Sequence, residues 1–324
     1  MHRIALVTAR RAQALDEDLP PLVAALAGRG AKADTPCWDD PAIDWSAYDA
    51  AVLRSTWDYM DRLGEFLAWV DRCAAATRLF NSPGLVRWNT DKHYLLDLAR
   101  AGVPVVPTLF AEPGMAPAEI LAQFLGGGPG ALSAGEPTAF EEFVIKPAIG
   151  VGSRDAGRYG RDESRDAVAH LGRLLEAGRS ALLQPYLASV DQHGETALVY
   201  LDGHYSHAIR KSALLRRGGP AVAGLFAPEE IAAREAGADE RTVGDAACGV
   251  VAAWNPLYLR VDLVRDGRGR PVVIEFELAE PSLFVTFAPR SAADFAGALL
   301  ARLEGPEPSG AGPVERITRA VATR

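Results

Sequence analysis

Leu259-Arg260-Val261-Asp262 and Ile274-Glu275-Phe276-Glu277 are two short stretches in which apolar and charged residues alternate. Such alternation predicts a pair of β-strands. Between them, Asp266-Gly267-Arg268-Gly269 has the composition of a tight turn, so we expect the strands to pair as an antiparallel hairpin. Successive side chains of a strand point to opposite faces, and Glu275 and Glu277 therefore share one face.

Three carboxylates meet on this face if the hairpin forms, because Asp262 then lies beside Glu275 and Glu277. Unpaired carboxylates on a half-buried sheet repel one another and lose solvation. A cation is therefore expected among them, and hard oxygen ligands favour Mg²⁺ or Mn²⁺, usually shared with substrate phosphates. The alternative is a charged, solvated hairpin face, which is common for such patterns. Segments upstream favour the cation.

The composition is ordinary for a soluble globular enzyme. The chain has 324 residues, 48% hydrophobic and 23% charged, which is enough for two or three packed lobes. A net charge of −8 argues against nucleic-acid binding, and no apolar run approaches the roughly 18 residues of a membrane span. The start of the chain lacks a signal-peptide layout and the three cysteines are far apart. We expect a cytoplasmic protein without disulfides or a zinc site.

The N-terminal part alternates strands and helices. Apolar runs at residues 4–9 and 50–55 predict strands, and residues 19–30 and 61–76 have helical patterns. This alternation indicates a small parallel α/β unit. Asn81-Ser82-Pro83-Gly84 has turn composition and predicts a boundary after the unit.

The rest of the chain is predicted to be rich in strands. Further helices are expected at residues 90–102, 117–125 and 228–251. Strands are expected at residues 103–110, 143–147, 181–187, 195–201, 204–211, 258–265 and 271–278. Residues 126–137 and the tail after Glu304 have the composition of loose, linker-like segments.

A glycine-containing loop follows a strand that carries one lysine. The strand Phe143-Val144-Ile145-Lys146-Pro147 leads into Ala148-Ile149-Gly150-Val151-Gly152-Ser153. Gly150 and Gly152 allow backbone N–H groups to approach an anion closely. The sequence is neither a Walker loop nor a dinucleotide-binding fingerprint. A loop that joins two strands after a lysine indicates a flap over phosphates, although Lys146 alone would suit an edge position facing solvent.

Two further segments are consistent with a nucleotide site. Lys92 is near the start of a predicted helix, where its charge can reach a nucleotide, although a solvated lysine is the simpler interpretation. Leu183-Gln184-Pro185-Tyr186-Leu187 ends a strand in a proline-containing hinge, where free backbone groups could bind an adenine edge. Asp191 and Glu195 could accept hydrogen bonds from ribose hydroxyls.

In order and spacing these segments resemble the ATP-grasp superfamily over residues 80–300. The resemblance implies an α/β (α+β) ATP-grasp fold in four parts. These are an N-terminal pre-ATP-grasp α/β domain at residues 1–85, a central lid subdomain at 86–187, a C-terminal antiparallel-sheet subdomain with the metal site at 188–304, and a flexible tail at 305–324.

The resemblance also implies how ATP is bound. Lys92 and Lys146 would bind the phosphates, under a flap formed by Gly150, Gly152 and Ser153. The adenine hinge would consist of Gln184, Pro185, Tyr186 and Leu187. Mg²⁺ would be held by Asp262, Glu275 and Glu277. Arg260 would stabilise charge on the transferred phosphoryl group. Members commonly have Asn where this chain has Glu277, so Glu277 is assigned to the metal or to the substrate.

Substrate binding is expected at the carboxyl end of a strand in the N-terminal unit, followed by Arg54-Ser55-Thr56-Trp57-Asp58-Tyr59. Arg54 and Ser55 could hold a carboxylate, while Trp57 and Tyr59 could line a small pocket. Alternatively, Trp57 only packs between lobes. Further anion-binding candidates are Arg210, Lys211 and Ser282, with Arg210 also a catalytic candidate beside Arg260 and Lys146.

ATP-grasp enzymes generally activate a carboxylate as an acyl phosphate, which a nucleophile then attacks. In residues 54–59, 207–211 and 275–283 the chain resembles the O-ureidoserine cyclo-ligases of antibiotic biosynthesis. The resemblance implies a small amino-acid-like substrate, O-ureido-D-serine, whose activated carboxylate is attacked internally to give D-cycloserine, ADP and phosphate. It also makes a homodimer plausible. The alternatives are an intermolecular carboxylate–amine ligase and a catalytically silent nucleotide-binding regulator.

Overall fold

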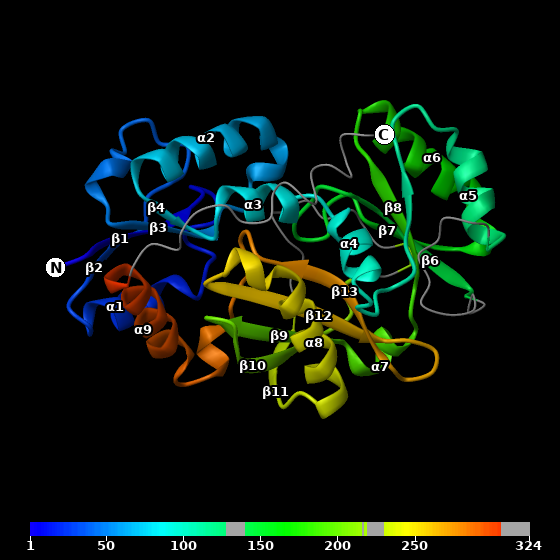
Figure 1. The fold of residues 1–324 in the computed structure, drawn as a ribbon. Helices are drawn as coiled ribbons and strands as arrows, with labels where there is room; N and C mark the ends of the chain where they lie inside the picture. Colours follow the sequence, from blue (N-terminus) through cyan, green and yellow to red (C-terminus); the bar gives the residue numbers. More distant parts are fainter. Residues whose placement is uncertain (128–139, 216, 219–229, 306–324) are drawn as a thin grey trace.

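Three β-sheets organise the residues that the computed structural model describes, namely 1–127, 140–215, 217–218 and 230–305. In Figure 1 the first sheet lies on the left, the second on the right and the third below and between them. The tail from residue 306, most of the expected loose stretch at 126–137 and the first two residues of the helix expected at 228–251 lie outside the described residues.

The first sheet is the predicted parallel α/β unit, and its strands have the order β2-β1-β3-β4. Its apolar strands are buried between helices on both sides, as expected for a parallel sheet. The elements are β1 (Arg3–Thr8), α1 (Leu19–Ala27), β2 (Lys32–Asp34), β3 (Ala50–Ser55), α2 (Leu63–Ala76) and β4 (Arg78–Phe80). Strands β2 and β4, each three residues long, were not predicted from the sequence.

The second sheet is antiparallel, with the order β5-β8-β6-β7. Two helices pack together and cover one face of it. The elements are β5 (Leu109–Ala111), α5 (Pro117–Leu125), β6 (Glu142–Pro147), β7 (Gly157–Gly160), α6 (Ser164–Glu176) and β8 (Ala181–Pro185). The glycine-containing loop joins the neighbouring strands β6 and β7, as predicted.

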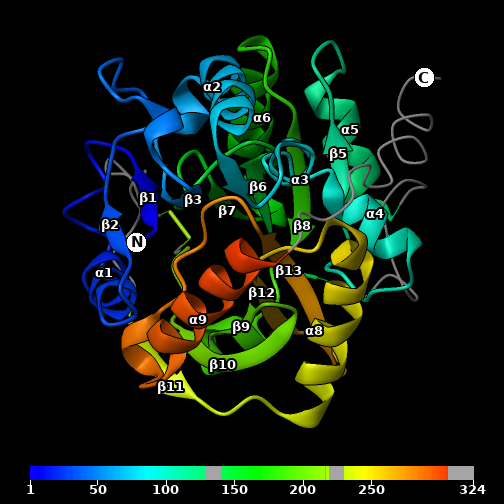
Figure 2. The same cartoon turned by 60° about the vertical axis from the view of Figure 1, so that its left-hand side comes forward.

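The third sheet is antiparallel, with the order β11-β10-β9-β12-β13. Across the predicted hairpin, Asp262 is paired with Glu275 and Arg260 with Glu277, so this prediction is confirmed. The elements are α7 (Ser189–His193), β9 (Glu195–Leu201), β10 (His204–Lys211), β11 (Ile231–Arg234), α8 (Ala238–Val251), β12 (Tyr258–Arg265), β13 (Pro271–Glu277) and α9 (Ser291–Glu304). Helix α9 lies against α1 and β9 and joins this sheet to the first unit (Figure 2).

Three local predictions were wrong. The single helix expected at 90–102 is shorter, α4 (Tyr94–Arg100), and is preceded by α3 (Pro83–Asn89), which Ser82 caps. The strand expected at 103–110 is reduced to β5 and one bridge, because Pro104 and Pro107 lack the N–H that a ladder needs. The helix expected at 228–251 begins only at Ala238, since the backbone N–H of Gly237 bonds to the Glu240 side chain and the preceding residues form β11.

A buried carboxylate in the first unit holds the chain that follows the third sheet. The Asp18 oxygens accept hydrogen bonds from the backbone N–H groups of Leu283 at 2.6 Å, Phe284 at 3.2 Å and Val285 at 2.9 Å. The buried Arg54 donates to Asp18 at 3.3 Å and to the carbonyl of Pro281 at 2.8 Å. These bonds fix the first unit to the segment after β13.

None of the helices in the described part of the chain is long and apolar enough to cross a membrane.

We predict that Asp18→Ala lowers the free energy of unfolding by about 3–5 kcal/mol, because it leaves Arg54 and three N–H groups buried without their acceptor. Urea denaturation followed by circular dichroism measures the change. The matched control is Asp294→Ala, which removes an exposed carboxylate 3.8 Å from Arg290 and should cost at most about 0.5 kcal/mol. Equal losses in the two variants would show that Asp18 does not hold the two parts together.

Candidate active site

One cavity of about 560 Å³ reaches from the second sheet, past the acidic hairpin, to the first unit. Its wall contains residues from all the predicted motif segments. From the second sheet and its loop come Lys146, Gly150, Gly152, Ser153 and the hinge residues Gln184, Pro185, Tyr186 and Leu187. From elsewhere come Trp57, Tyr59, Lys92, Glu195, Lys211, Arg260, Glu275, Glu277, Glu280 and Ser282.

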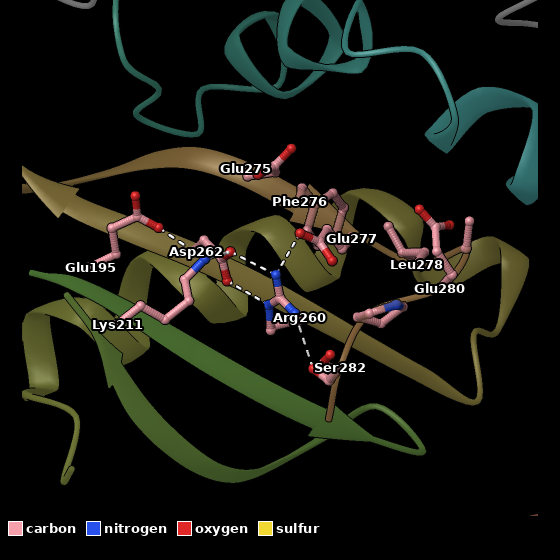
Figure 3. A network of polar contacts seen from close by, with 12 residues as sticks. Glu195, Lys211, Arg260, Asp262, Glu275, Phe276, Glu277, Leu278, Glu280 and Ser282 are labelled. Atoms are coloured by element: carbon pink, nitrogen blue, oxygen red, sulfur yellow. Dashed lines mark hydrogen bonds and ion pairs between the residues drawn. The ribbon is translucent and has the colours of Figure 1, made fainter. Parts of the chain in front are cut away.

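Ion pairs and hydrogen bonds on the hairpin face form a network that connects Glu195, Lys211, Asp262, Arg260 and Glu277 (Figure 3). Arg260 donates from Nε to Asp262 Oδ1 at 2.8 Å and also pairs with Glu277. The Lys211 ammonium lies 2.6 Å from Asp262 and 2.9 Å from Glu195. The Lys92 ammonium lies 3.0 Å from Glu275. Each carboxylate of the predicted trio therefore has a cationic partner from the protein.

The network sets different pKa values on its three carboxyl groups. Burial opposes ionisation of Glu275, but Lys92 and Lys146 outweigh it and hold its pKa well below the ordinary range. Burial of Asp262 is likewise outweighed by Arg260 and Lys211, which lower its pKa. For Glu277, burial outweighs Arg260 and raises the pKa to about 8. Burial also lowers the pKa of the Lys146 ammonium, since that group has less compensation from carboxylates.

The donor set suits a hard divalent cation. Asp262, Glu275 and Glu277 each offer one oxygen, and these oxygens lie within 4.8 Å of one another. Carboxylate oxygen is the ligand that Mg²⁺ prefers. Glu275 and Glu277 line the cavity, whereas Asp262 is fully buried and its oxygens accept from Lys211 and Arg260.

The flap has the backbone shape that its glycines allow. Gly152 has φ of 64°, a left-handed conformation that glycine adopts without strain, and Ser153 follows it with φ of 61°. The Lys92 ammonium donates to the carbonyl of Gly150 at 2.8 Å, so the start of the flap is tied to the acidic hairpin through one lysine.

Besides the buried Asp262, four of the expected site residues do not line the cavity. Arg210 is exposed, because strand alternation on β10 directs it away from the face that carries Lys211. Asp191 is bonded to Arg158 and Tyr186. Arg54 and Ser55 are fully buried behind the cavity wall. Arg54 therefore holds backbone and Asp18 instead of presenting its guanidinium to the cavity.

Glu280 is an acidic residue of the cavity wall that was not among the predicted site residues. It is 9% exposed, and its Oε2 has no hydrogen-bond partner in the described structure. Burial raises its pKa to about 7, which the nearby Tyr59 hydroxyl and Lys92 oppose. Its place in Glu280-Pro281-Ser282, just past the strand that carries Glu275, was the available signal.

Known proteins match this chain over nearly its full length. Residues 4–81 match the family described as the N-terminal domain of D-cycloserine synthetase DcsG. The cycloserine biosynthesis protein DcsG of Streptomyces lavendulae is 42% identical over 306 residues, which cover 93% of this chain and 99% of that protein. The crystal structure of D-cycloserine synthetase DcsG superposes with a TM-score of 0.84 at 42% identity, over 93% of this chain and 99% of that one.

More distant structures share the fold alone. D-alanine–D-alanine ligase from Bacillus anthracis matches with a TM-score of 0.62 at 14% identity, covering 94% of this chain and 98% of that one. The ATP-grasp ligase PsnB in complex with a minimal precursor matches with a TM-score of 0.60 at 20% identity, covering 92% and 98%.

A glycine flap and an acidic hairpin that face one cavity, on a fold shared with these enzymes, define the class as the ATP-grasp ligases. The protein is thus an ATP-dependent ligase. Identity of 42% over almost all of both chains places it more narrowly, and the chain belongs to the DcsG family.

We predict that Lys92→Met weakens ATP binding about 10- to 100-fold, because it removes a buried ammonium that contacts both the flap and Glu275. Isothermal titration calorimetry with a non-hydrolysable ATP analogue and Mg²⁺ measures the affinity. Lys32→Met, which removes an exposed lysine from the first unit, is the control and should leave the affinity unchanged. Unchanged affinity in Lys92→Met would exclude a phosphate-binding role for Lys92.

Proposed function

We propose that this protein closes the ring of cycloserine from O-ureido-D-serine with ATP, and that it belongs to antibiotic biosynthesis. The observation that carries the proposal is the 42% identity to DcsG over 99% of that protein. A cavity that runs from the hinge to Trp57 and Tyr59 supports it, because a small substrate and a nucleotide phosphate can then share one cavity.

The chemistry needs two bond-forming steps to close the ring and a third step that consumes one water. A carboxylate oxygen of the substrate attacks the γ-phosphorus of ATP, ADP leaves, and an acyl phosphate forms. The nitrogen bonded to the serine oxygen then attacks the carbonyl carbon, and phosphate leaves as the five-membered ring closes. Transfer of the carbamoyl group from that nitrogen to water yields carbamic acid and D-cycloserine, and this balances the atoms.

The proposed binding roles follow the cavity wall. Lys92 and Lys146 neutralise phosphate charge, and Gly150, Gly152 and Ser153 cover the phosphates. Adenine is held at the hinge, which comprises Gln184, Pro185, Tyr186 and Leu187, with Glu195 near the ribose.

The acidic hairpin provides the proposed metal and charge-stabilising groups. Mg²⁺, with Mn²⁺ as a substitute, would be held by Asp262, Glu275 and Glu277 and would neutralise phosphate oxygens when bound. Arg260 supplies a fixed cation for the developing oxyanion, because its own position is locked by Asp262 and by the carbonyl of Ser282 at 3.0 Å.

Trp57, Tyr59 and Ser282 line the proposed substrate end of the cavity, and Lys211, the other substrate-binding candidate in the cavity wall, lies 2.9 Å from Glu195. Arg210 and Asp191 are left out of the proposal, since neither lines the cavity, while Arg54 acts by holding the backbone at Pro281. The proposed domains remain residues 1–85, 86–187 and 188–304. A cytoplasmic location and a homodimer complete the proposal, and light scattering after size-exclusion chromatography tests the dimer.

The first prediction concerns the substrate. We expect ADP release with O-ureido-D-serine as sole acceptor in the presence of ATP and Mg²⁺, and a ring-closed product by mass spectrometry. A panel of amino acids, singly and in pairs, is the comparison. ADP release only with a pair would replace the proposal with an intermolecular ligase, and no ADP release with any substrate would indicate a silent nucleotide-binding protein.

The second prediction concerns the acidic hairpin. Glu275→Gln and Asp262→Asn should each lower kcat by about 1000-fold or more, because each removes a negative ligand from the site of phosphoryl transfer. The fold should persist, as measured by circular dichroism. Glu65→Gln, an exposed residue of α2, is the control and should retain full activity. Near-normal turnover in either hairpin variant would exclude the metal assignment.

A further inference from the structure

The segment of residues 278–285 crosses beneath the cavity and is held by buried side chains from several elements. Its backbone carbonyls accept from Trp57 at Glu280, from Arg54 at Pro281 and from Arg260 at Ser282, at 3.0, 2.8 and 3.0 Å. Asp18 holds the N–H groups that follow. Such dense anchoring fixes the backbone on both sides of Glu280.

The Glu280 carboxylate enters the cavity from this fixed segment. It is more than nine-tenths buried, and no cation lies within 4.0 Å of it among the described residues. Figure 3 shows the contrast, since dashed contacts join Arg260 to Asp262 and Glu277 and none reaches Glu280. Within the described part of the chain, its Oε2 has no hydrogen-bond partner.

Burying a carboxylate oxygen without a hydrogen-bond partner raises the free energy of the folded state, because the charged acceptor loses its solvation and gains no bond in return. Among the other carboxylates of the wall, Glu195, Glu275 and Glu277 are paired with Lys211, Lys92 and Arg260. Asp16 also has an unpartnered oxygen, but its other oxygen accepts from the backbone N–H of Asp18 and Arg54 lies near it. Because Glu280 lines the cavity together with Trp57 and Tyr59, a group that enters the cavity can approach its carboxylate. A carboxylate beside aromatic side chains suits a compact cation that donates hydrogen bonds, which is the chemistry of a primary ammonium.

We propose that Glu280 binds the ammonium group of the amino-acid substrate. This inference rests on the proposed function, because it assigns a residue to one group of that substrate. The same rigid segment carries Ser282, whose carbonyl holds Arg260, so the distance between the ammonium site and the cation at the reacting carboxylate is fixed by the protein. The ammonium group would then be held by Glu280, the carboxylate would lie at Arg260, and the side chain would lie against Trp57 and Tyr59. Contact with three substituents of the α-carbon is what an enzyme needs to distinguish the D enantiomer from the L enantiomer.

The test compares two compounds that differ by one group. The first is O-ureido-D-serine, and the second is its deamino analogue, 3-(ureidooxy)propanoate. Wild type should show a KM about 10- to 100-fold higher for the analogue. Glu280→Gln should raise the KM for O-ureido-D-serine by the same factor, leave the KM for the analogue within about threefold, and leave the KM for ATP unchanged. It should also reduce the preference for D over L.

Tyr59→Phe is the second variant and keeps the test informative if Glu280→Gln folds poorly, which thermal melting would reveal. Removing the hydroxyl beside Glu280 should raise the KM for the amine-bearing substrate severalfold and leave the analogue unaffected. Glu119→Gln, an exposed residue of α5, is the matched control and should match wild type with both compounds.

Two results would overturn the proposal. Equal losses with both compounds would show that Glu280 acts on the structure of the site, and an unchanged KM for O-ureido-D-serine in Glu280→Gln would show that it does not contact the substrate. If wild type does not release ADP with O-ureido-D-serine, the proposed function fails separately. The same comparison, made with the amino acid that does support ADP release and its deamino counterpart, then decides the role of Glu280.

Discussion

Asp262 is paired with Glu275 across one antiparallel hairpin, and burial removes solvation from both carboxylates. The positions of the other charged residues in the site depend on this loss of solvation. Carboxylates on a buried sheet face are stable only with compensating charge nearby. Lys211 approaches from β10, Arg260 from β12 itself and Lys92 from just before α4, and each is largely buried as a result. The acidic hairpin thus determines where cationic side chains of distant segments lie.

These cations also hold backbone, which extends the effect beyond the sheet. Lys92 joins Glu275 to the flap at Gly150, and Arg260 joins Asp262 to the segment at Ser282. The glycine-containing loop and the segment at Ser282 are therefore both held by carboxylates of the same hairpin. A change in charge at the hairpin is expected to act on both segments, which suits an enzyme that must bring a phosphoryl group and a carboxylate together.

Most of the fold could be predicted from the sequence where the signal is local. Alternation and a turn defined the hairpin, and the lysine with its glycine loop located the β6–β7 connection. Side-chain direction and long-range partners could not be read in this way. Arg210 and Lys211 look alike in sequence, yet strand alternation directs them to opposite faces. Arg54 was predicted to bind an anion, but it donates hydrogen bonds to Asp18 and to the carbonyl of Pro281, both distant in sequence. Glu280 can be recognised only from the three-dimensional structure, which shows that its Oε2 is buried without a hydrogen-bond partner among the described residues.

The hydrogen bonds between Asp18 and residues 283–285 limit how freely the N-terminal unit could be exchanged between related proteins. A small parallel α/β unit at the front of a ligase looks like an interchangeable module, yet here its first helix, α1, directly follows Asp18, the residue that holds the backbone beyond β13. Recombination that exchanged residues 1–85 between distant relatives would separate Asp18 and Arg54 from the backbone they hold. Viable chimeras are expected to carry both halves of this contact from one parent, and the two ends of the gene should accordingly evolve as a linked pair.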